Sequence, residues 1–229
     1  MYIASSSFIV QDMTGIQVFN PEGFFVSRVW RSHKPWECFG LAEDEQRRLW
    51  FIDFNWRSKE THLKCYDLKE EKPVKGISLK ELVGDRSRES KCRFLTFSKG
   101  KLYVTDLGLD QVYILDPNNL ESFRKFGSSG AGDGQFNDPA GVVVDDVGTI
   151  LVADSRNHRL CLHDKNGKWM KNQPVMNLIL LVLLNQNLSQ DGVMRVRRPS
   201  ALLLDRQGRE LYCLNLQGSE AVVKYRASL

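Results

Sequence analysis

Residues 132–160 read GDGQFNDPAGVVVDDVGTILVADSRNHRL. Two apolar runs lie within this stretch, at 140–144 and 150–153, and each is followed by an aspartate, Asp145 or Asp154. Runs rich in Val, Ile and Leu that are free of proline and bounded by polar turn residues are typical of β-strands. The stretch therefore predicts two strands joined by the turn between them.

The second of these runs recurs along the chain. An apolar, β-rich segment that closes on Asp or Asn occurs at 8–12, 49–53, 102–106, 150–154 and 211–215. The closing residues are 41, 53, 48 and 61 positions apart. A base period of about 40–45 residues, with insertions, is the spacing of β-propeller blades. The repetition predicts an all-β propeller with about five recognisable blades.

Each repeated segment has strand-like neighbours. A second strand is expected after a short polar turn, at 16–19, 63–66, 111–115, 160–163 and 222–225. Three of these strands run into turns rich in Asn, Asp, Gly or Pro, which supply the backbone angles that tight turns need. A preceding strand is clearest at 140–145 and 201–205. The predicted unit is therefore a four-stranded, up-and-down blade.

The stretch at 132–160 resembles an NHL repeat. Asn157, His158 and Arg159 stand where that family has its Asn-His-Leu triplet, with Arg159 in place of the Leu and Leu160 after it. The last blade echoes the same pattern more loosely at 198–201. The resemblance implies a propeller that usually closes with six blades, so about five blades predict an incomplete six-bladed ring.

One propeller domain is expected over residues 1–229. Its blades are predicted at roughly 1–33, 34–83, 84–130, 131–194 and 195–229. The first blade is expected to lack its first strand, because Met1 lies only seven residues before Phe8. The last blade is expected to end on a third strand. These features predict either the C-terminal part of a longer protein or a sequence taken from a truncated gene model.

Residues 171–194 break the repeat and are expected to form an irregular insertion. An unusual fourth strand or a misassigned stretch of sequence is favoured over a binding loop or one that touches a membrane. The apolar run at 178–184 is too short for a membrane-spanning helix, which takes about 20 residues.

Charge and cysteine content set the broad class. The net charge of +4 permits an acidic partner without requiring one. The five cysteines are dispersed and form no Cys-x-x-Cys pair, which predicts reduced thiols and a cytoplasmic location. No secretory signal or membrane span is expected.

The sequence offers little chemistry for catalysis. The four histidines are spread over different blades and lack the spacing of a zinc site. No Gly-x-Ser-x-Gly or Walker loop occurs, and the Gly-rich stretch 127–134 lacks the Lys of a phosphate loop. We therefore expect no catalytic residue, metal, cofactor or small-molecule ligand. A propeller enzyme of the amidating-lyase type is a remote alternative. Such enzymes use a metal and a disulfide-bearing framework, and this sequence shows neither the histidine set nor the cysteine pairing.

Strand alternation separates the loops of a propeller into two faces. The turns between second and third strands share one face with the connections between blades, and the charges of these loops sum to a positive value. Trp30, Trp36, Trp56 and Phe136 lie near these loops, and cations with aromatic rings can bind single-stranded nucleic acid. Core packing is the competing interpretation of the aromatic residues. The candidate binding residues are Arg57, Arg156, His158, Arg195, Arg197 and Arg198.

A structural role competes with binding at the NHL triplet. Asp154 and Asn157 can satisfy backbone groups of the turn, and Arg159 can pair with a carboxylate. These three residues are predicted to form a structural corner, and His158 is open to the same interpretation.

The resemblance extends to the C-terminal domain of TRIM-NHL proteins. It implies RING, B-box and coiled-coil portions upstream, with ubiquitin-ligase activity and oligomerisation through the coiled coil; none of these elements is in this sequence. In such proteins the propeller selects the partner. We therefore expect a non-catalytic binding module that docks protein substrates of a TRIM-NHL-like E3 ligase. The alternative is a module that binds single-stranded RNA for post-transcriptional repression.

Overall fold

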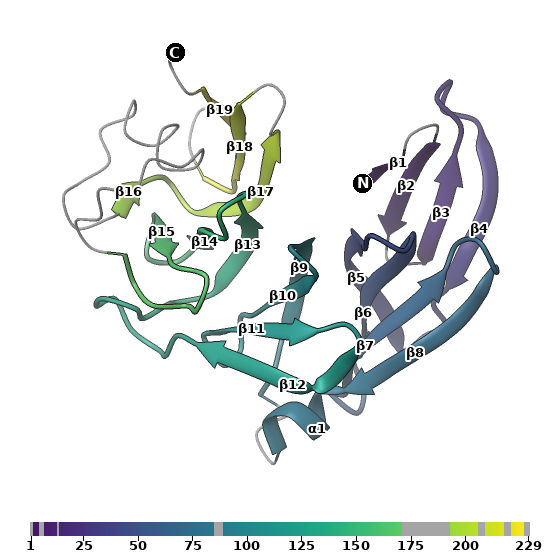
Figure 1. The fold of residues 1–229 in the computed structure, drawn as a ribbon, viewed down its shortest axis with the longest axis horizontal. Helices are drawn as coiled ribbons and strands as arrows, with labels where there is room; N and C mark the ends of the chain where they lie inside the picture. The colour runs from purple at the N-terminus through teal and green to yellow at the C-terminus, as the bar shows by residue number, and fades with distance from the viewer. Residues whose placement is uncertain are drawn as a thin grey trace. The chain divides into compact units, whose positions relative to one another are not determined.

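The computed structural model describes residues 2–4, 7–12, 14–84, 89–170, 193–205, 209–217 and 221–226 (Figure 1). Within these residues the regular secondary structure is all β-strand apart from one short helix. The strands form five successive sheets, and in each of them the strands pair in chain order. This arrangement is that of β-propeller blades, so the fold predicted from the sequence is confirmed.

The first two sheets occupy the N-terminal part of the chain. Sheet one contains β1 (Tyr2–Ala4), β2 (Ser7–Asp12), β3 (Gly15–Phe19) and β4 (Phe25–Arg31). Sheet two contains β5 (Trp36–Glu43), β6 (Arg48–Asn55), β7 (Thr61–Asp67) and β8 (Lys72–Ser78). The helix α1 (Leu79–Val83) follows β8, and its first turn is capped by Ser78, whose side chain accepts a hydrogen bond from the Lys80 amide.

The other three sheets follow. Sheet three contains β9 (Cys92–Ser98), β10 (Lys101–Asp106), β11 (Gln111–Asp116) and β12 (Asn119–Phe126). Sheet four contains β13 (Pro139–Val144), β14 (Ile150–Asp154), β15 (Arg159–His163) and β16 (Val193–Arg195). Sheet five contains β17 (Pro199–Asp205), β18 (Glu210–Asn215) and β19 (Val222–Arg226).

The repeated segments of the sequence coincide with the second strands of the five sheets, β2, β6, β10, β14 and β18. The prediction that the first sheet lacks its first strand is wrong. β1 pairs antiparallel with β2, placing Tyr2 opposite Ile9 and Ala4 opposite Ser7. Seven residues suffice because antiparallel neighbours can be joined by a very short connection, which leaves room for a three-residue strand.

The chain divides into two compact units, and the division runs within sheet three. Unit one comprises residues 1–102 and 115–123, and unit two comprises residues 103–114 and 124–229. The one-domain organisation and the blade boundaries stay predictions. The predicted insertion at 171–194 lies outside the described residues, apart from its last two positions, which belong to β16.

Each unit has its own apolar core, to which every second residue along a strand contributes because successive side chains point to opposite faces of a sheet. In unit one the core contains Ile9, Ile16, Cys38, Leu49 and Phe51. In unit two it contains Tyr103, Val112, Ile114, Phe136, Val142, Val144, Ile150, Val152 and Cys161. The second core fixes sheet four, whose loops carry most of the predicted site residues.

Candidate binding site

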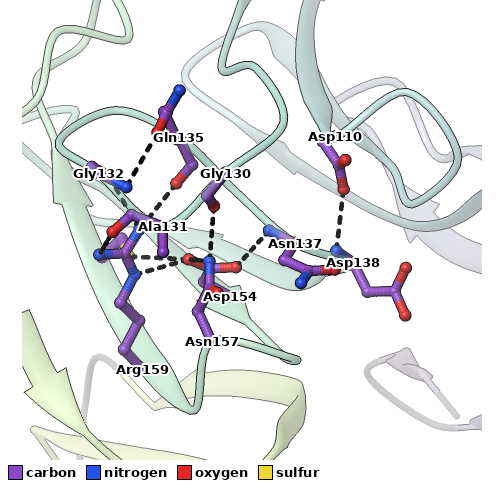
Figure 2. A network of polar contacts seen from close by, with 11 residues as sticks. Asp110, Gly130, Ala131, Gly132, Gln135, Asn137, Asp138, Asp154, Asn157 and Arg159 are labelled. Carbon is purple, nitrogen blue, oxygen red and sulfur yellow. Dashed lines mark hydrogen bonds and ion pairs between the residues drawn. The ribbon is translucent and has the colours of Figure 1, made fainter.

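A polar network closes the turn between β14 and β15 in unit two. Asp154, the last residue of β14, is fully buried. Its Oδ1 accepts a hydrogen bond from the Asn137 amide at 2.7 Å. Its Oδ2 accepts from Asn157 Nδ2 at 2.8 Å and from Arg159 Nε at 2.6 Å (Figure 2). Burial raises the pKa of Asp154, and these hydrogen bonds oppose that shift.

Arg159 ties a glycine-rich loop onto the same carboxylate. Its side chain is 5% exposed, and its guanidinium also donates to the carbonyls of Ala131, Gly132 and Gln135 at 2.8–3.1 Å. Asn157 adds a 2.8 Å hydrogen bond to the Gly130 carbonyl (Figure 2). The structure thus brings together the three residues predicted to form the structural corner. Because the Arg159 charge is used internally, it is not available to a ligand.

His158, in the same turn, organises the loop that follows β16. It has a left-handed backbone, with φ of 55°. Its carbonyl accepts a hydrogen bond from the Val196 amide, and its Nδ1 accepts from the Arg198 amide, both at 3.0 Å. A neutral imidazole has one accepting and one donating nitrogen, so these bonds leave Nε2–H free to donate.

An open cleft of about 570 Å³ lies beside this contact, and we call it the arginine cleft. It is lined by His158, Arg195, Val196, Arg197 and Gln217. Arg195 and Arg197 are exposed. Among the residues that the structure describes, no carboxylate forms an ion pair with either arginine. The cleft therefore presents two arginine charges that no described carboxylate compensates.

The remaining predicted binding residues have other surroundings. Arg156 is exposed, but its Nε pairs with an Asp138 carboxylate oxygen at 2.5 Å. Arg198 is half-buried, and its backbone joins His158 to Leu216, whose amide donates to the Arg198 carbonyl at 2.9 Å. Arg57 is exposed in unit one. The structure thus brings together His158, Arg195 and Arg197, with Arg198 as a backbone support.

Sequence reasoning did not select Gln217 or Val196 as site residues. Gln217 follows Asn215, the residue that closes β18, so it occupies the turn equivalent to that of His158. This equivalence was a usable signal. Val196 gave none, because its place in the cleft depends on its hydrogen bond to the His158 carbonyl.

The four aromatic candidates differ in exposure. Phe136 is fully buried in the core of unit two, so it cannot stack on a ligand. Trp30 packs against Phe51, with ring centroids 5.2 Å apart, and Trp36 packs against His62 at 4.9 Å. Both tryptophans are half-buried. Trp56 is 44% exposed and stays accessible to a partner.

Other chemistry is sparse in the part of the chain that the structure describes. It contains no group of three or more His, Cys, Asp or Glu side chains placed to hold a metal. None of its helices has the length and apolar character needed to cross a membrane. The five cysteines are buried and not disulfide-bonded, and burial raises the pKa of Cys65 to about 11 and that of Cys213 to about 12.

One known protein family matches the stretch that contains the structural corner. Residues 136–161 match the NHL repeat family. The sheets and this repeat together define the class of protein, a β-propeller that carries an NHL repeat.

The chain is similar to TRIM-NHL proteins over this region. It is 49% identical over 45 residues to the B-box type zinc finger protein ncl-1 of Caenorhabditis elegans. It is 47% identical, also over 45 residues, to the protein brain tumor of Drosophila melanogaster. Each match covers 20% of this chain but only 5% and 4% of the two relatives, so the chain matches a small fraction of their length. The resemblance stated from the sequence is confirmed.

Solved structures show the same fold across nearly the whole chain. A luciferin-regenerating enzyme superposes with a TM-score of 0.66 at 15% identity, covering 98% of this chain and 75% of its own. At this identity the likeness concerns the fold alone, since one fold hosts many unrelated functions.

Proposed function

We propose that this chain is a macromolecule-binding propeller module whose arginine cleft binds the phosphates of single-stranded RNA. The observation that carries the proposal is the pair of exposed arginines, Arg195 and Arg197, in a cleft where no described carboxylate compensates them. His158 is exposed, lines the cleft and contributes its Nε2–H as a further donor.

Charge without an internal partner favours an anionic ligand. A cation that binds phosphate releases condensed counterions, and this release supplies most of the non-specific affinity for nucleic acid. Arg156 illustrates the opposite case, because binding to phosphate would require it to leave Asp138.

The composition of the cleft favours RNA over a protein partner. Hot spots of protein interfaces are enriched in Trp, Tyr and Arg that fill well-packed, desolvated pockets. In the arginine cleft Val196 is the single apolar residue among the five lining residues that the structure describes, and the remainder are cationic or polar.

A second candidate function is the docking of protein substrates for a TRIM-NHL-like E3 ubiquitin ligase. It is supported by apolar side chains on sheet five, where Leu203 is 63% exposed and Val222 is 58% exposed. Leu214, paired in register with Val222, is 37% exposed. Exposed apolar patches of this kind mark interaction surfaces. Similarity to a B-box protein over the NHL region agrees with this candidate.

Binding of a fluorescent random-sequence, single-stranded RNA pool at several salt concentrations tests the RNA proposal. We expect salt-sensitive binding by the wild-type chain and its loss in Arg195→Glu/Arg197→Glu. Neutral Arg195→Gln/Arg197→Gln should reduce the salt slope by about 1.4, or about 0.7 for each phosphate contact to a single strand.

The matched control is Lys125→Glu/Lys165→Glu, which makes the same change in net charge at two exposed lysines outside the cleft. If folded wild-type chain does not bind at low salt, or if both charge-reversed variants lose binding equally, the arginine cleft is not an RNA site. Protein docking would then be the better account.

A further inference from the structure

The indole of Trp56, in unit one, is exposed and packs against other aromatic rings. It begins the turn between β6 and β7, and its backbone amide donates to the Pro35 carbonyl at 2.9 Å. The buried Phe54 meets it edge-on, with ring centroids 4.9 Å apart and planes at 88°. Phe39 meets it at 6.5 Å and 71°. The ring is therefore held in place although 44% of the residue is exposed.

Two cationic side chains lie near this indole. The ammonium of Lys59 lies 5.3 Å from the ring centroid. The guanidinium of Arg93 lies 5.4 Å from the centroid of the Trp56 ring, 4.1 Å from that of Phe39 and 4.4 Å from that of Phe54. These are cation–π distances. The side chain of Arg93 is packed against the aromatic cluster, whereas Lys59 is exposed.

The turn that carries these groups is fixed by its own hydrogen bonds. Asn55 Oδ1 accepts from the amides of Arg57 and Ser58 at 2.9 Å and 3.0 Å. Arg57 and Lys59 therefore belong to an ordered turn, and both residues are exposed.

We propose that Trp56 is a stacking platform for one unpaired nucleobase, with Arg57 and Lys59 binding the adjoining phosphates. Every base has a π face, so an exposed, rigid indole accepts bases with little sequence preference, and neighbouring cations follow the backbone. Lys59 has a flexible stem and moves from the ring to a phosphate when the base stacks. The inference rests on the RNA-binding function proposed above and adds a contact that is independent of charge.

A cycle that combines protein and RNA changes tests the platform. The probes are a short single-stranded RNA and versions of it with one abasic position, and the proteins are wild type, Trp56→Ala and Trp56→Phe. Loss of one stacked base should weaken binding by about five- to hundredfold. We expect Trp56→Ala to show this loss with the intact RNA and to stop distinguishing intact RNA from the abasic version that wild type binds worst.

Two further readouts separate stacking from other effects. Trp56→Ala should leave the salt slope unchanged, because an indole carries no charge, and Trp56→Phe should keep most of the affinity. RNA should quench tryptophan fluorescence in wild type, and the quenching should diminish in Trp56→Phe. The comparison of fluorescence quenching between wild type and Trp56→Phe remains informative if Trp56→Ala does not fold. Trp36→Phe, which changes a half-buried ring beside His62, is the matched control.

The outcomes distinguish the platform from the cleft. If wild type binds RNA and Arg195→Glu/Arg197→Glu abolishes binding, but folded Trp56→Ala binds normally and quenching persists in Trp56→Phe, the platform is refuted and the cleft stands. If Trp56→Ala weakens intact and abasic RNA equally, the effect is not stacking, and a role as an anchor for a protein would better explain the exposure. Absence of all RNA binding by folded wild type refutes the proposed function and the platform together.

Discussion

Arg159 and Arg195 lie opposite each other on the paired strands β15 and β16, yet their surroundings differ completely. The side chain of Arg159 is 5% exposed and bonded to one carboxylate and three backbone carbonyls. Arg195 is exposed and lines the arginine cleft. The first arginine holds the structural corner together, and the second is the one that we propose binds phosphate. Two arginines at the same register position are thus buried and paired on one strand and exposed on the next.

The difference originates in what each strand places nearby. The carboxylate that closes β14 and the carbonyls of Ala131, Gly132 and Gln135 converge on Arg159 (Figure 2). A buried cation is tolerated when its charge is paired and its donors are hydrogen-bonded. No comparable set surrounds Arg195 among the described residues, so its charge remains solvated. The role of an arginine in this chain is therefore decided by its acceptors.

Removal of Arg159 should produce the largest effect. Arg159→Ala leaves Asp154 buried without its cation, which typically costs about 3–5 kcal/mol of the free energy of unfolding. Arg195→Ala should change it by less than about 0.5 kcal/mol, as is usual for surface positions. Urea unfolding measured side by side checks both values.

Arg159→Lys sharpens the same comparison. Lysine restores the charge but lacks the planar fork that reaches three carbonyls, so its stability should fall between wild type and Arg159→Ala. At position 195 the corresponding change to lysine should preserve most RNA binding, because phosphate accepts a point charge. Equal losses of stability in Arg159→Ala and Arg195→Ala would contradict the division of roles.

The repeat and the corner were accessible from sequence for a local reason. The second strand of each of the five sheets closes on Asp or Asn. Asp154, Asn157 and Arg159 lie within six positions of one another. Short separation made their contact predictable. The strand β1 was missed because a three-residue strand has too little sequence to show a pattern.

The cleft depends on contacts between distant positions. His158 and Arg198 are joined across 40 residues, and neither side chain's chemistry specifies that bond. Phe136 was predicted near the binding loops, but it is buried because it packs against Phe126 and His163, at centroid distances of 6.1 Å and 5.3 Å. Loop position indicated exposure, whereas tertiary packing decided burial.

An intermediate effect on stability is expected at His163. This residue is buried among aromatic rings, in contrast to Arg159, which is buried beside the Asp154 carboxylate. His163 is fully buried, and its ring lies 4.8–5.3 Å from the rings of Phe126, Phe136 and Trp169. Burial lowers its pKa from 6.5 to about 3. Between these values the unfolded chain binds a proton that the folded chain does not, so stability is lost as the pH falls below about 6.5.

The expected contribution of His163 at pH 5 is a loss of about 2 kcal/mol relative to neutral pH, at about 1.4 kcal/mol per pH unit. Urea unfolding over this pH range measures it. His163→Phe fits the aromatic surroundings and should flatten the dependence, whereas His33→Ala, at an exposed position, is the control. A dependence that persists unchanged in His163→Phe would show that another group carries the acid sensitivity.

The smallest effect on stability should come from the ion pair of Arg156 and Asp138. Arg156 is paired with a carboxylate, as Arg159 is, but it is exposed, as Arg195 is. The Arg156 side chain is 58% exposed and that of Asp138 is 26% exposed. Pairs exposed to solvent contribute about 0.2–1 kcal/mol and are screened by salt. A double-mutant cycle of Arg156→Ala and Asp138→Asn, followed by urea unfolding at low and high salt, should therefore give a coupling in this range that declines at high salt. Asp138→Asn also frees the Arg156 charge, so it should strengthen RNA binding slightly, and this gain should vanish when Arg156 is Ala. A gain that survives in the double variant would mean that Asp138 acts by repelling RNA and not by holding Arg156.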